Sequence, residues 1–135
     1  MADIEVKDNS KEYLAAFEKQ LALGLRAVGE AAEGHAKKDC PVDTGRLRNS
    51  ITYATNDYSG VGTYSDSNGN SYSDATATGT PPKSEVYIGT NVEYAQYVEF
   101  RDKVAHPTGK AHFLRDAAAK HGKEYRAIIK AALRD

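Results

Sequence analysis

The chain has no tryptophan, only one cysteine and no long hydrophobic segment. Because a disulfide needs two thiols, Cys40 cannot form one within the chain, and the fold must be stabilised by packing. No window approaches the roughly 20 consecutive apolar residues of a membrane-spanning helix. The first residues, MADIEVKDNSKEY, are acidic and polar, whereas a signal peptide begins with basic residues followed by an apolar segment. We therefore expect a protein that is made and kept in the cytosol, without a membrane partner.

Signatures of catalysis, metal binding and nucleotide binding are also lacking. The sequence contains no GxxxxGK[ST] loop, no CxxC pair and no HExxH helix. A cysteine nucleophile needs a nearby base, and the conceivable partners of Cys40 are His35, His106, His112 and His121. A lone thiol at a helix end before a proline is more often inert, so a cysteine-dependent hydrolase is only the third hypothesis. We predict no catalytic residue, no cofactor and no metal site.

What is present fits one modest domain. The 135 residues are expected to form a single domain over residues 1–135. The net charge is only -1 but is unevenly placed: residues 41–100 carry three basic and seven acidic groups, and residues 101–135 carry nine and four. Such asymmetry permits head-to-tail association of identical subunits or contact with nucleic acid, although a solvated helix face is the simpler interpretation.

Two amphipathic helices are predicted near the ends of the chain. The first runs from Ser10, the expected N-cap, to Lys38, and Cys40–Pro41 ends it. Its apolar stripe consists of Leu14, Phe17, Leu21, Leu25, Val28 and Ala32. Leu23 points away from this stripe and is available to a neighbouring subunit. The second helix, after Gly109, has the stripe Leu114, Ala118, His121, Tyr125, Ile128 and Ala132, with His121 as a hydrogen-bonded core histidine and the opposite face formed by Lys123, Arg126, Lys130 and Arg134.

Between the helices the pattern predicts a small antiparallel sheet. Alternation of apolar and polar residues indicates a strand over residues 47–55 and another over 85–90. Residues 57–82 are rich in Gly, Ser, Thr, Asn, Asp and Tyr, which predicts a long flexible hairpin or loop insertion, and Asn68–Gly69 is typical of a type I′ hairpin turn. The segment 91–100 fits a short helix. Two helices flanking a small sheet give an α+β domain.

Three ordered motifs add a resemblance to a known family. They are PVDTGRLRNSI at 41–51, VYIGT at 86–90 with YAQYVEF at 94–100, and AHFLRDA at 111–117. In this order and spacing they resemble the head-tail joining and tail-completion proteins of siphophages, which are small components of the phage neck. The chain departs from that pattern at Arg101, where glycine is common, and at His112, where proline is common.

The motif residues are expected to have structural roles. Asp43 and Thr44 can cap a turn through side-chain hydrogen bonds, and Gly45 can adopt a positive φ. Arg46 and Arg48 are expected to pair with carboxylates such as Glu99, at the surface or between subunits. Leu47 and Ile51 are expected to enter the sheet, the segment from Tyr94 to Phe100 to pack against it, and the motif with Phe113 and Leu114 to anchor the last helix to the core. The motifs therefore read as a fold signature and not as a catalytic one.

The resemblance implies a structural virion protein at the head-tail junction that completes the tail and enables its attachment to the head. Its implied partners are other phage neck and tail proteins and further copies of itself in a ring, in the virion and, during assembly, in the host cytoplasm. Adaptor, stopper and terminator roles at the same junction remain alternatives. A different class of function is a non-specific DNA-contacting module, in which phosphates of channel DNA are met by Lys123, Arg126, Lys130 and Arg134.

Overall fold

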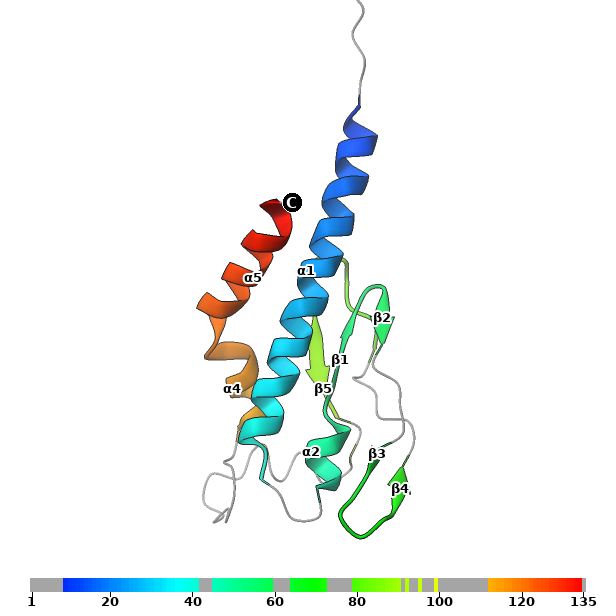
Figure 1. Ribbon diagram of the computed structural model, residues 1–135, viewed down its shortest axis with the longest axis vertical. Helices are drawn as coiled ribbons and strands as arrows, with labels where there is room; N and C mark the ends of the chain where they lie inside the picture. Colours follow the sequence, from blue (N-terminus) through cyan, green and yellow to red (C-terminus); the bar gives the residue numbers. More distant parts are fainter. Residues whose placement is uncertain are drawn as a thin grey trace, which may run out of the picture.

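The computed structural model describes residues 9–41, 45–59, 64–72, 79–90, 92, 95, 99 and 112–134. Over these residues the chain has the predicted α+β architecture, with a long first helix, small antiparallel sheets and helices at the carboxyl-terminal end. In Figure 1, α4 (Phe113–Ala119) and α5 (Gly122–Arg134) lie on one side of α1 (Ser10–Asp39), and the sheet lies on the other. Helix α1 is therefore the central element against which both halves pack.

Helix α1 begins and ends close to the predicted positions. Its N-cap is Asn9 and not Ser10, because the carbonyl of Asn9 already accepts hydrogen bonds from the first turn. At the other end, Cys40 has extended backbone with φ −67° and ψ 130°, as expected of a residue that precedes a proline. The carboxyl-terminal part of the predicted apolar stripe is buried, at Leu25, Val28 and Ala32.

The larger sheet is antiparallel with the strand order β2-β1-β5. Its strands are β1 (Thr52–Thr55), β2 (Tyr58–Ser59) and β5 (Tyr87–Gly89). The predicted strand over residues 85–90 is confirmed in its central part as β5. The Tyr58 ring ties β2 to both of its neighbours. It stacks on Tyr53 of β1 with centroids 4.7 Å apart, and the Arg26 guanidinium of α1 lies 4.6 Å from its centroid.

The strand predicted over residues 47–55 is wrong in its first half, which is the helix α2 (Arg46–Ser50). Gly45 precedes α2 with φ +84°, which confirms the predicted left-handed conformation. Leu47 and Ile51 are buried as predicted. Because these two residues are four apart, their burial fits one face of a helix as well as alternation along a strand.

A second, two-stranded sheet lies in the segment that was expected to be a hairpin or loop insertion. It consists of β3 (Tyr64–Ser65) and β4 (Ser71–Tyr72). The dipeptide Asn68–Gly69 lies in the connecting loop, as predicted, but the loop is not a type I′ turn, because Gly69 alone of the two has a positive φ, of +85°. The Asp66 carboxylate holds this loop by accepting hydrogen bonds from the backbone N–H groups of Asn68 and Asn70, each at 3.0 Å.

This hairpin is docked on α2. The Asn49 side-chain amide donates a 2.7 Å hydrogen bond to the carbonyl of Ser65, and the Arg46 guanidinium lies 4.4 Å from the centroid of Tyr72. The Tyr64 ring stacks on Tyr72 and packs against the hydrophobic core. Residues 60–63 and 73–78 of the predicted insertion lie outside the described residues.

The predicted carboxyl-terminal helix is in fact two helices, α4 and α5, separated at Lys120 and His121. Gly122 follows the break, and glycine has one of the lowest intrinsic helix propensities. The Tyr125 hydroxyl bridges the corner by donating a hydrogen bond to the carbonyl of Ala117. The break lets α4 turn its buried face into the core while α5 runs back along α1.

Two glycines in α1 permit close packing on its two sides. At Gly24 a Cβ atom would lie 3.0 Å from the Ala132 Cβ and 3.0 Å from the Ile129 Cδ1, both on α5. At Gly29 a Cβ atom would lie 2.6 Å from Cγ of Tyr53 on β1. The absence of side chains at these positions lets α5 and the sheet approach α1 directly.

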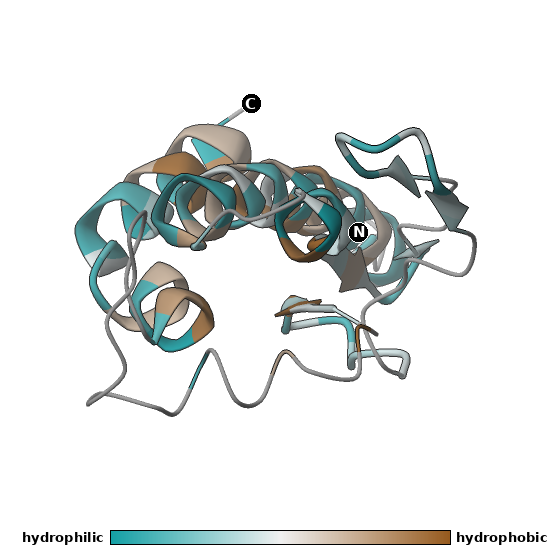
Figure 2. Cartoon of the chain, turned by 90° about the horizontal axis from the view of Figure 1, so that it is seen from below, coloured by the Kyte–Doolittle hydropathy of each residue, from teal (hydrophilic) through white to brown (hydrophobic). Residues whose placement is uncertain are grey.

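The core lies around the carboxyl-terminal end of α1. Its buried members are Ala36, Cys40, Leu47, Ile51, Val92, Ala95, Phe113 and Ala117, with Leu114 partly buried against them. This confirms the predicted packing of Leu47 and Phe113, whereas the expectations for Asp43, Thr44, Tyr94 and Phe100 fall outside the described residues. Figure 2 shows hydrophilic positions along all the helices, and within the described residues none is long and apolar enough to cross a bilayer.

Candidate assembly surface

The amino-terminal turns of α1 extend beyond the rest of the fold (Figure 1). The apolar stripe that is buried lower down continues onto these turns, but there it is uncovered: Leu14 is 57% exposed and Phe17 is 50% exposed. Burying a side chain of this kind contributes roughly 1.5–3 kcal/mol. The predicted stripe is therefore covered within the chain at Leu25 and beyond but not at its first two positions, and these are suited to a contact with another protein.

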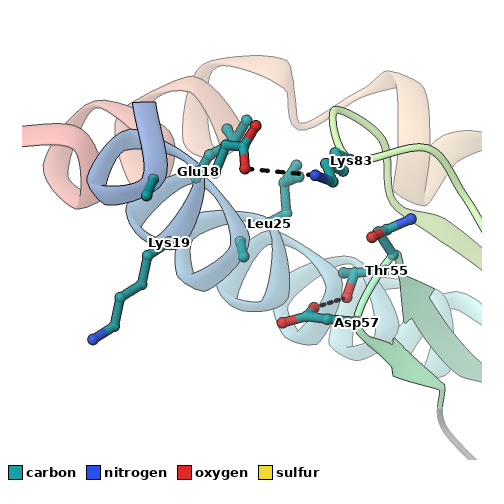
Figure 3. A pocket seen from close by; sticks show the side chains of 10 residues that line it. Glu18, Lys19, Leu25, Thr55, Asp57 and Lys83 are labelled. Carbon is teal, nitrogen blue, oxygen red and sulfur yellow. Dashed lines mark hydrogen bonds and ion pairs between the residues drawn. The ribbon is translucent and has the colours of Figure 1, made fainter. Parts of the chain in front are cut away.

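A groove lies beside these turns, between α1 and the turn that connects β1 to β2 (Figure 3). Its volume is about 290 Å³. Apolar side chains line it on the α1 side, including Leu21 and Leu25, and polar side chains border it, including Thr55 and Asp57, which share a 2.8 Å hydrogen bond. A hydrophobic floor with a polar rim is the usual composition of a protein contact surface.

One ion pair crosses this groove. Lys83 Nζ lies 3.5 Å from Glu18 Oε2, and the two side chains point toward each other in Figure 3. Lys19, on the next position of α1, points away from them. Both partners are partly solvent-exposed, so the pair contributes little to stability, on the order of 0–1 kcal/mol, and can be broken when another molecule enters.

The second predicted face, on α5, is exposed as expected. All four of its cations lie in solvent: Lys123, Arg126, Lys130 and Arg134. The opposite face of α5 packs on α1 at Gly24. Leu23, predicted to point away from the α1 stripe, is also exposed, at 52%.

The acidic middle of the chain is less available than its formal charge indicates. Of the four acidic residues that the structure describes between 41 and 100, Glu99 is buried. Asp66 accepts hydrogen bonds inside its own hairpin; its partial desolvation opposes ionisation, but the bonds from Asn70, Tyr72 and Asn68 together hold its pKa below the usual range. Asp57 and Glu85 remain as exposed acidic groups at the surface.

Glu99 has a structural task at the start of α4. Its two carboxylate oxygens accept hydrogen bonds from the backbone N–H groups of Leu114 and Arg115, each at 2.9 Å, and its carbonyl accepts one from His112 at 2.8 Å. A carboxylate in this position satisfies N–H groups that have no helical partner and interacts favourably with the helix dipole. This motif residue therefore holds α4 in place.

Cys40 is poorly suited to nucleophilic chemistry. It is 1% exposed, and its Sγ contacts the carbonyl of Pro41 at 3.4 Å. Burial raises the pKa of the thiol to about 12, while Arg48 lowers it and Glu99 raises it to smaller extents. The reactive thiolate is strongly disfavoured, which speaks against the cysteine-dependent hydrolase.

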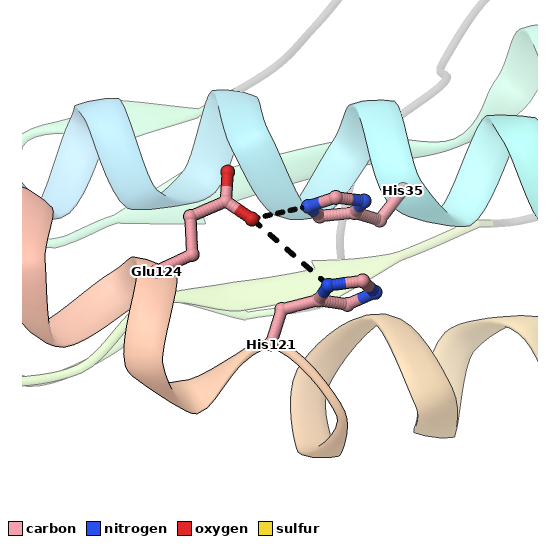
Figure 4. A group of neighbouring side chains, drawn as sticks. All are labelled: His35, His121 and Glu124. Carbon is pink, nitrogen blue, oxygen red and sulfur yellow. Dashed lines mark hydrogen bonds and ion pairs between the residues drawn. The ribbon is translucent and has the colours of Figure 1, made fainter.

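A second cluster of polar side chains joins α1 to the corner between α4 and α5 (Figure 4). His35 Nε2 lies 2.7 Å from Glu124 Oε2, and the rings of His35 and His121 are stacked with centroids 3.5 Å apart. His121 is therefore not the predicted core histidine, because 31% of its side chain is exposed. The three-residue spacing of His121 and Glu124 was visible in the sequence, but the approach of His35 across 89 positions from Glu124 was not.

Comparison with known protein families gives a match that covers the amino-terminal part of the chain. Residues 4–100 match the model of the protein family described as "Bacteriophage HK97-gp10, putative tail-component". This range includes α1, α2 and the strands but not α4 or α5. No curated protein and no solved structure matches the chain.

Proposed function

Because the chain belongs to the HK97-gp10-like family of bacteriophage tail components, we propose that it completes the tail and enables its attachment to the head. As a tail component it is a structural protein of the virion, whose partners are other phage structural proteins. The proposal adds a place at the head-tail junction, in a ring of identical subunits in contact with neck and tail proteins. No catalytic step is required of it.

The uncovered part of the α1 stripe is the observation that carries this proposal. Leu14 and Phe17 lie on the same face as the buried Leu25, at the end of α1 that projects beyond the body of the fold. A neighbour that covers them would extend the hydrophobic core of one subunit into the next. The adjoining groove, with its apolar floor, offers that neighbour a concave seat.

A ring follows if this surface is met by a different surface of an identical subunit, since such heterologous contacts close into rings when the rotation per subunit closes. The charge distribution supports that orientation. The exposed cations of α5 can face the exposed Asp57 and Glu85 of the next subunit. Charge pairs at a solvent-exposed rim mainly set orientation and association rate, so the apolar contact supplies most of the affinity.

The test is made in the phage that encodes the chain. Deleting the gene is expected to leave full heads beside unattached tails in negative-stain images, and supplying the wild-type gene in trans restores joined particles. A variant with Leu14→Ser and Phe17→Ser is expected to fold normally but to fail in this rescue, because it removes the apolar contact. The matched control is Glu12→Ser, an exposed position in the same turns of α1 that does not line the groove.

Two results would contradict the proposal. Normal particles from the deletion phage would exclude a joining or completion role. Full rescue by the Leu14→Ser and Phe17→Ser variant would show that the uncovered stripe is not the contact. Far-ultraviolet circular dichroism and the sedimentation coefficient of each purified variant establish that the substitutions leave the fold intact.

A second candidate function, contact with channel DNA, is favoured by one specific observation. The four cations of α5 are all exposed, and they lie outside the range that matches the family. Each phosphate neutralised by such a group makes binding more sensitive to salt, so a steep loss of duplex retention between low and physiological salt is expected. A variant with Lys123→Glu, Lys130→Glu and Arg134→Glu should abolish that retention.

The same charge-reversed variant separates the two functions. If α5 only orients neighbouring subunits, the variant assembles poorly while the wild-type protein shows no salt-dependent DNA retention. If α5 contacts DNA, the wild-type protein is retained and the variant is not. Unchanged sedimentation, DNA retention and phage yield in the variant would discard both roles of α5.

A further inference from the structure

We propose that His35, His121 and Glu124 form a binding site for a divalent transition-metal ion of the zinc type. Each histidine offers one imidazole nitrogen and Glu124 offers one carboxylate oxygen, and these three atoms all lie within 4.8 Å of one another. They come from three places in the fold, namely α1, the corner after α4, and the first turn of α5. An ion bound there would join these elements.

The spacing of the donor atoms fits a single ion. With metal–ligand distances of about 2.0–2.2 Å, two ligand atoms of a tetrahedral zinc ion lie roughly 3.3 Å apart. His35 Nε2 is 2.7 Å from Glu124 Oε2, and His121 Nδ1 is 3.9 Å from the same oxygen. One pair is slightly closer than an ion requires and the other slightly wider. Side-chain shifts of about half an ångström bring each histidine to this spacing from Glu124. The two histidine nitrogens, which lie within 4.8 Å of each other, must reach the same spacing through rotation of the rings.

The two rings must turn before both can bind one ion. The imidazole planes are within 5° of parallel, with centroids 3.5 Å apart, whereas the lone pair of each donor nitrogen lies in the plane of its own ring. In Figure 4 both donor nitrogens face the same oxygen of Glu124, which is already their common partner. A tilt of one ring toward the other would direct both lone pairs at an ion bound beside that oxygen, with three protein ligands around it.

The chemistry of the donor set selects the class of ion. Two imidazoles and one carboxylate are ligands typical of zinc sites that keep an open coordination position. Nickel, copper and cobalt ions are expected to bind the same set, since affinity for nitrogen and oxygen ligands follows the usual order of divalent metals. Magnesium and calcium prefer all-oxygen ligand sets and are not expected to compete.

An ion can reach the site from solvent. The side chains of His35, His121 and Glu124 are 26%, 31% and 45% exposed. The ring of Tyr125 lies beside both histidines, with centroids 6.3 Å and 6.2 Å away, and covers part of the cluster. The site is thus open enough for exchange and its ligands are held by packed helices.

The consequence for the molecule is a fixed position of α5. Helix α5 lies outside the family-matched range and carries no buried residue of its own. A metal bond from His35 to the first turn of α5 would clamp this helix on α1 and so fix the direction in which its cations point. Because the ligands must be deprotonated, the clamp would open on acidification.

The test uses the full-length protein after removal of metals with a chelator. Isothermal titration with zinc chloride at neutral pH is expected to show one ion per chain, and cobalt is expected to give the absorption bands of a low-coordinate ion. His35→Gln and His121→Gln should each weaken zinc binding at least tenfold. Glu33→Gln is the matched control, because Glu33 lies on α1 but pairs with Lys37 at 3.6 Å.

A second measurement does not depend on the folding of any variant. In wild-type protein, zinc is expected to shift the imidazole NMR signals of His35 and His121 and to leave those of His106 and His112 unchanged. The absence of stoichiometric binding would overturn the proposal. So would equal affinity in the wild-type, His35→Gln and His121→Gln proteins, or zinc shifts confined to the other two histidines, because the ion would then bind elsewhere.

Discussion

Replacing Gly29 by alanine tests how closely the sheet approaches α1. A Cβ atom at this position would lie 2.6 Å from Cγ and 2.8 Å from Cε2 of Tyr53. Carbon atoms in favourable contact are about 3.5–4.0 Å apart, so the ring or the helix must move by roughly 1 Å. Tyr53 is 4% exposed and cannot swing into solvent without opening the core.

The magnitude follows from two opposing effects. Overpacking a buried site costs about 1–3 kcal/mol, whereas alanine is better than glycine inside a helix by about 1 kcal/mol. The net expectation for Gly29→Ala is a loss of about 0–2 kcal/mol in the free energy of unfolding. Gly34 is the matched control, since it lies in the same helix with no atom within 4 Å of an added Cβ.

Gly34→Ala should therefore gain up to about 1 kcal/mol, so that two chemically identical substitutions differ by about 1–3 kcal/mol. For a chain of this length that is a difference in Tm of about 4–12 °C. Urea unfolding followed by circular dichroism gives both free energies. Combining Gly29→Ala with Tyr53→Leu should recover part of the loss, which a double-mutant cycle measures as a coupling energy.

The reasoning is refuted if Gly29→Ala is as stable as the Gly34→Ala protein. The same holds if the two substitutions at Gly29 and Tyr53 prove additive, because then the ring does not occupy the space beside Gly29. A loss at Gly34→Ala as large as that at Gly29→Ala would instead show that α1 does not follow a regular helix between them.

Three further substitutions give independent checks. Glu99→Gln should lower the free energy of unfolding by about 1–3 kcal/mol in urea, since an amide cannot accept both hydrogen bonds at the start of α4; an unchanged midpoint would contradict this cap. Gly24→Val should cost about 1–3 kcal/mol by displacing Ala132 and Ile129, and wild-type stability would show that α5 does not pack there. Folded Cys40 should resist iodoacetamide at pH 8, and rapid labelling without unfolding would refute its burial. Because its folded pKa of about 12 lies above the ordinary value of 9.0, its contribution to stability is complete below pH 9 and is lost as pH rises through 12; Cys40→Ala should flatten that decline.

The sequence predicted the elements whose pattern depends on local periodicity. The end of α1 before Pro41 and the burial of Leu25, Val28 and Ala32 follow from helical spacing and from the restriction that proline places on the preceding residue. Spacing does not show how far a partner extends along a helix. The same spacing places Leu14 and Phe17 on the stripe, although the structure leaves their side chains exposed.

The errors have a common physical origin in contacts between distant parts of the chain. Leu47 and Ile51 satisfy the spacing of a helix face as well as that of a strand, and tertiary packing decides between them. The cap that Glu99 provides to α4 depends on a helix 15 residues away in sequence. The cluster around His35 depends on the break before Gly122, which turns α5 back along α1.

The length of α1 gives the chain a projecting helical arm. Its 30 residues span about 45 Å at 1.5 Å per residue, and the packed part begins near Leu21, so the exposed turns reach roughly 15 Å beyond the body of the fold. The unpacked turns of α1 are too few to form a stable helix by themselves in water. A neighbour that covers Leu14 would therefore order the arm and bind it in the same event. The length of α1, which runs without interruption from the arm into the core, would then set the distance between neighbouring subunits.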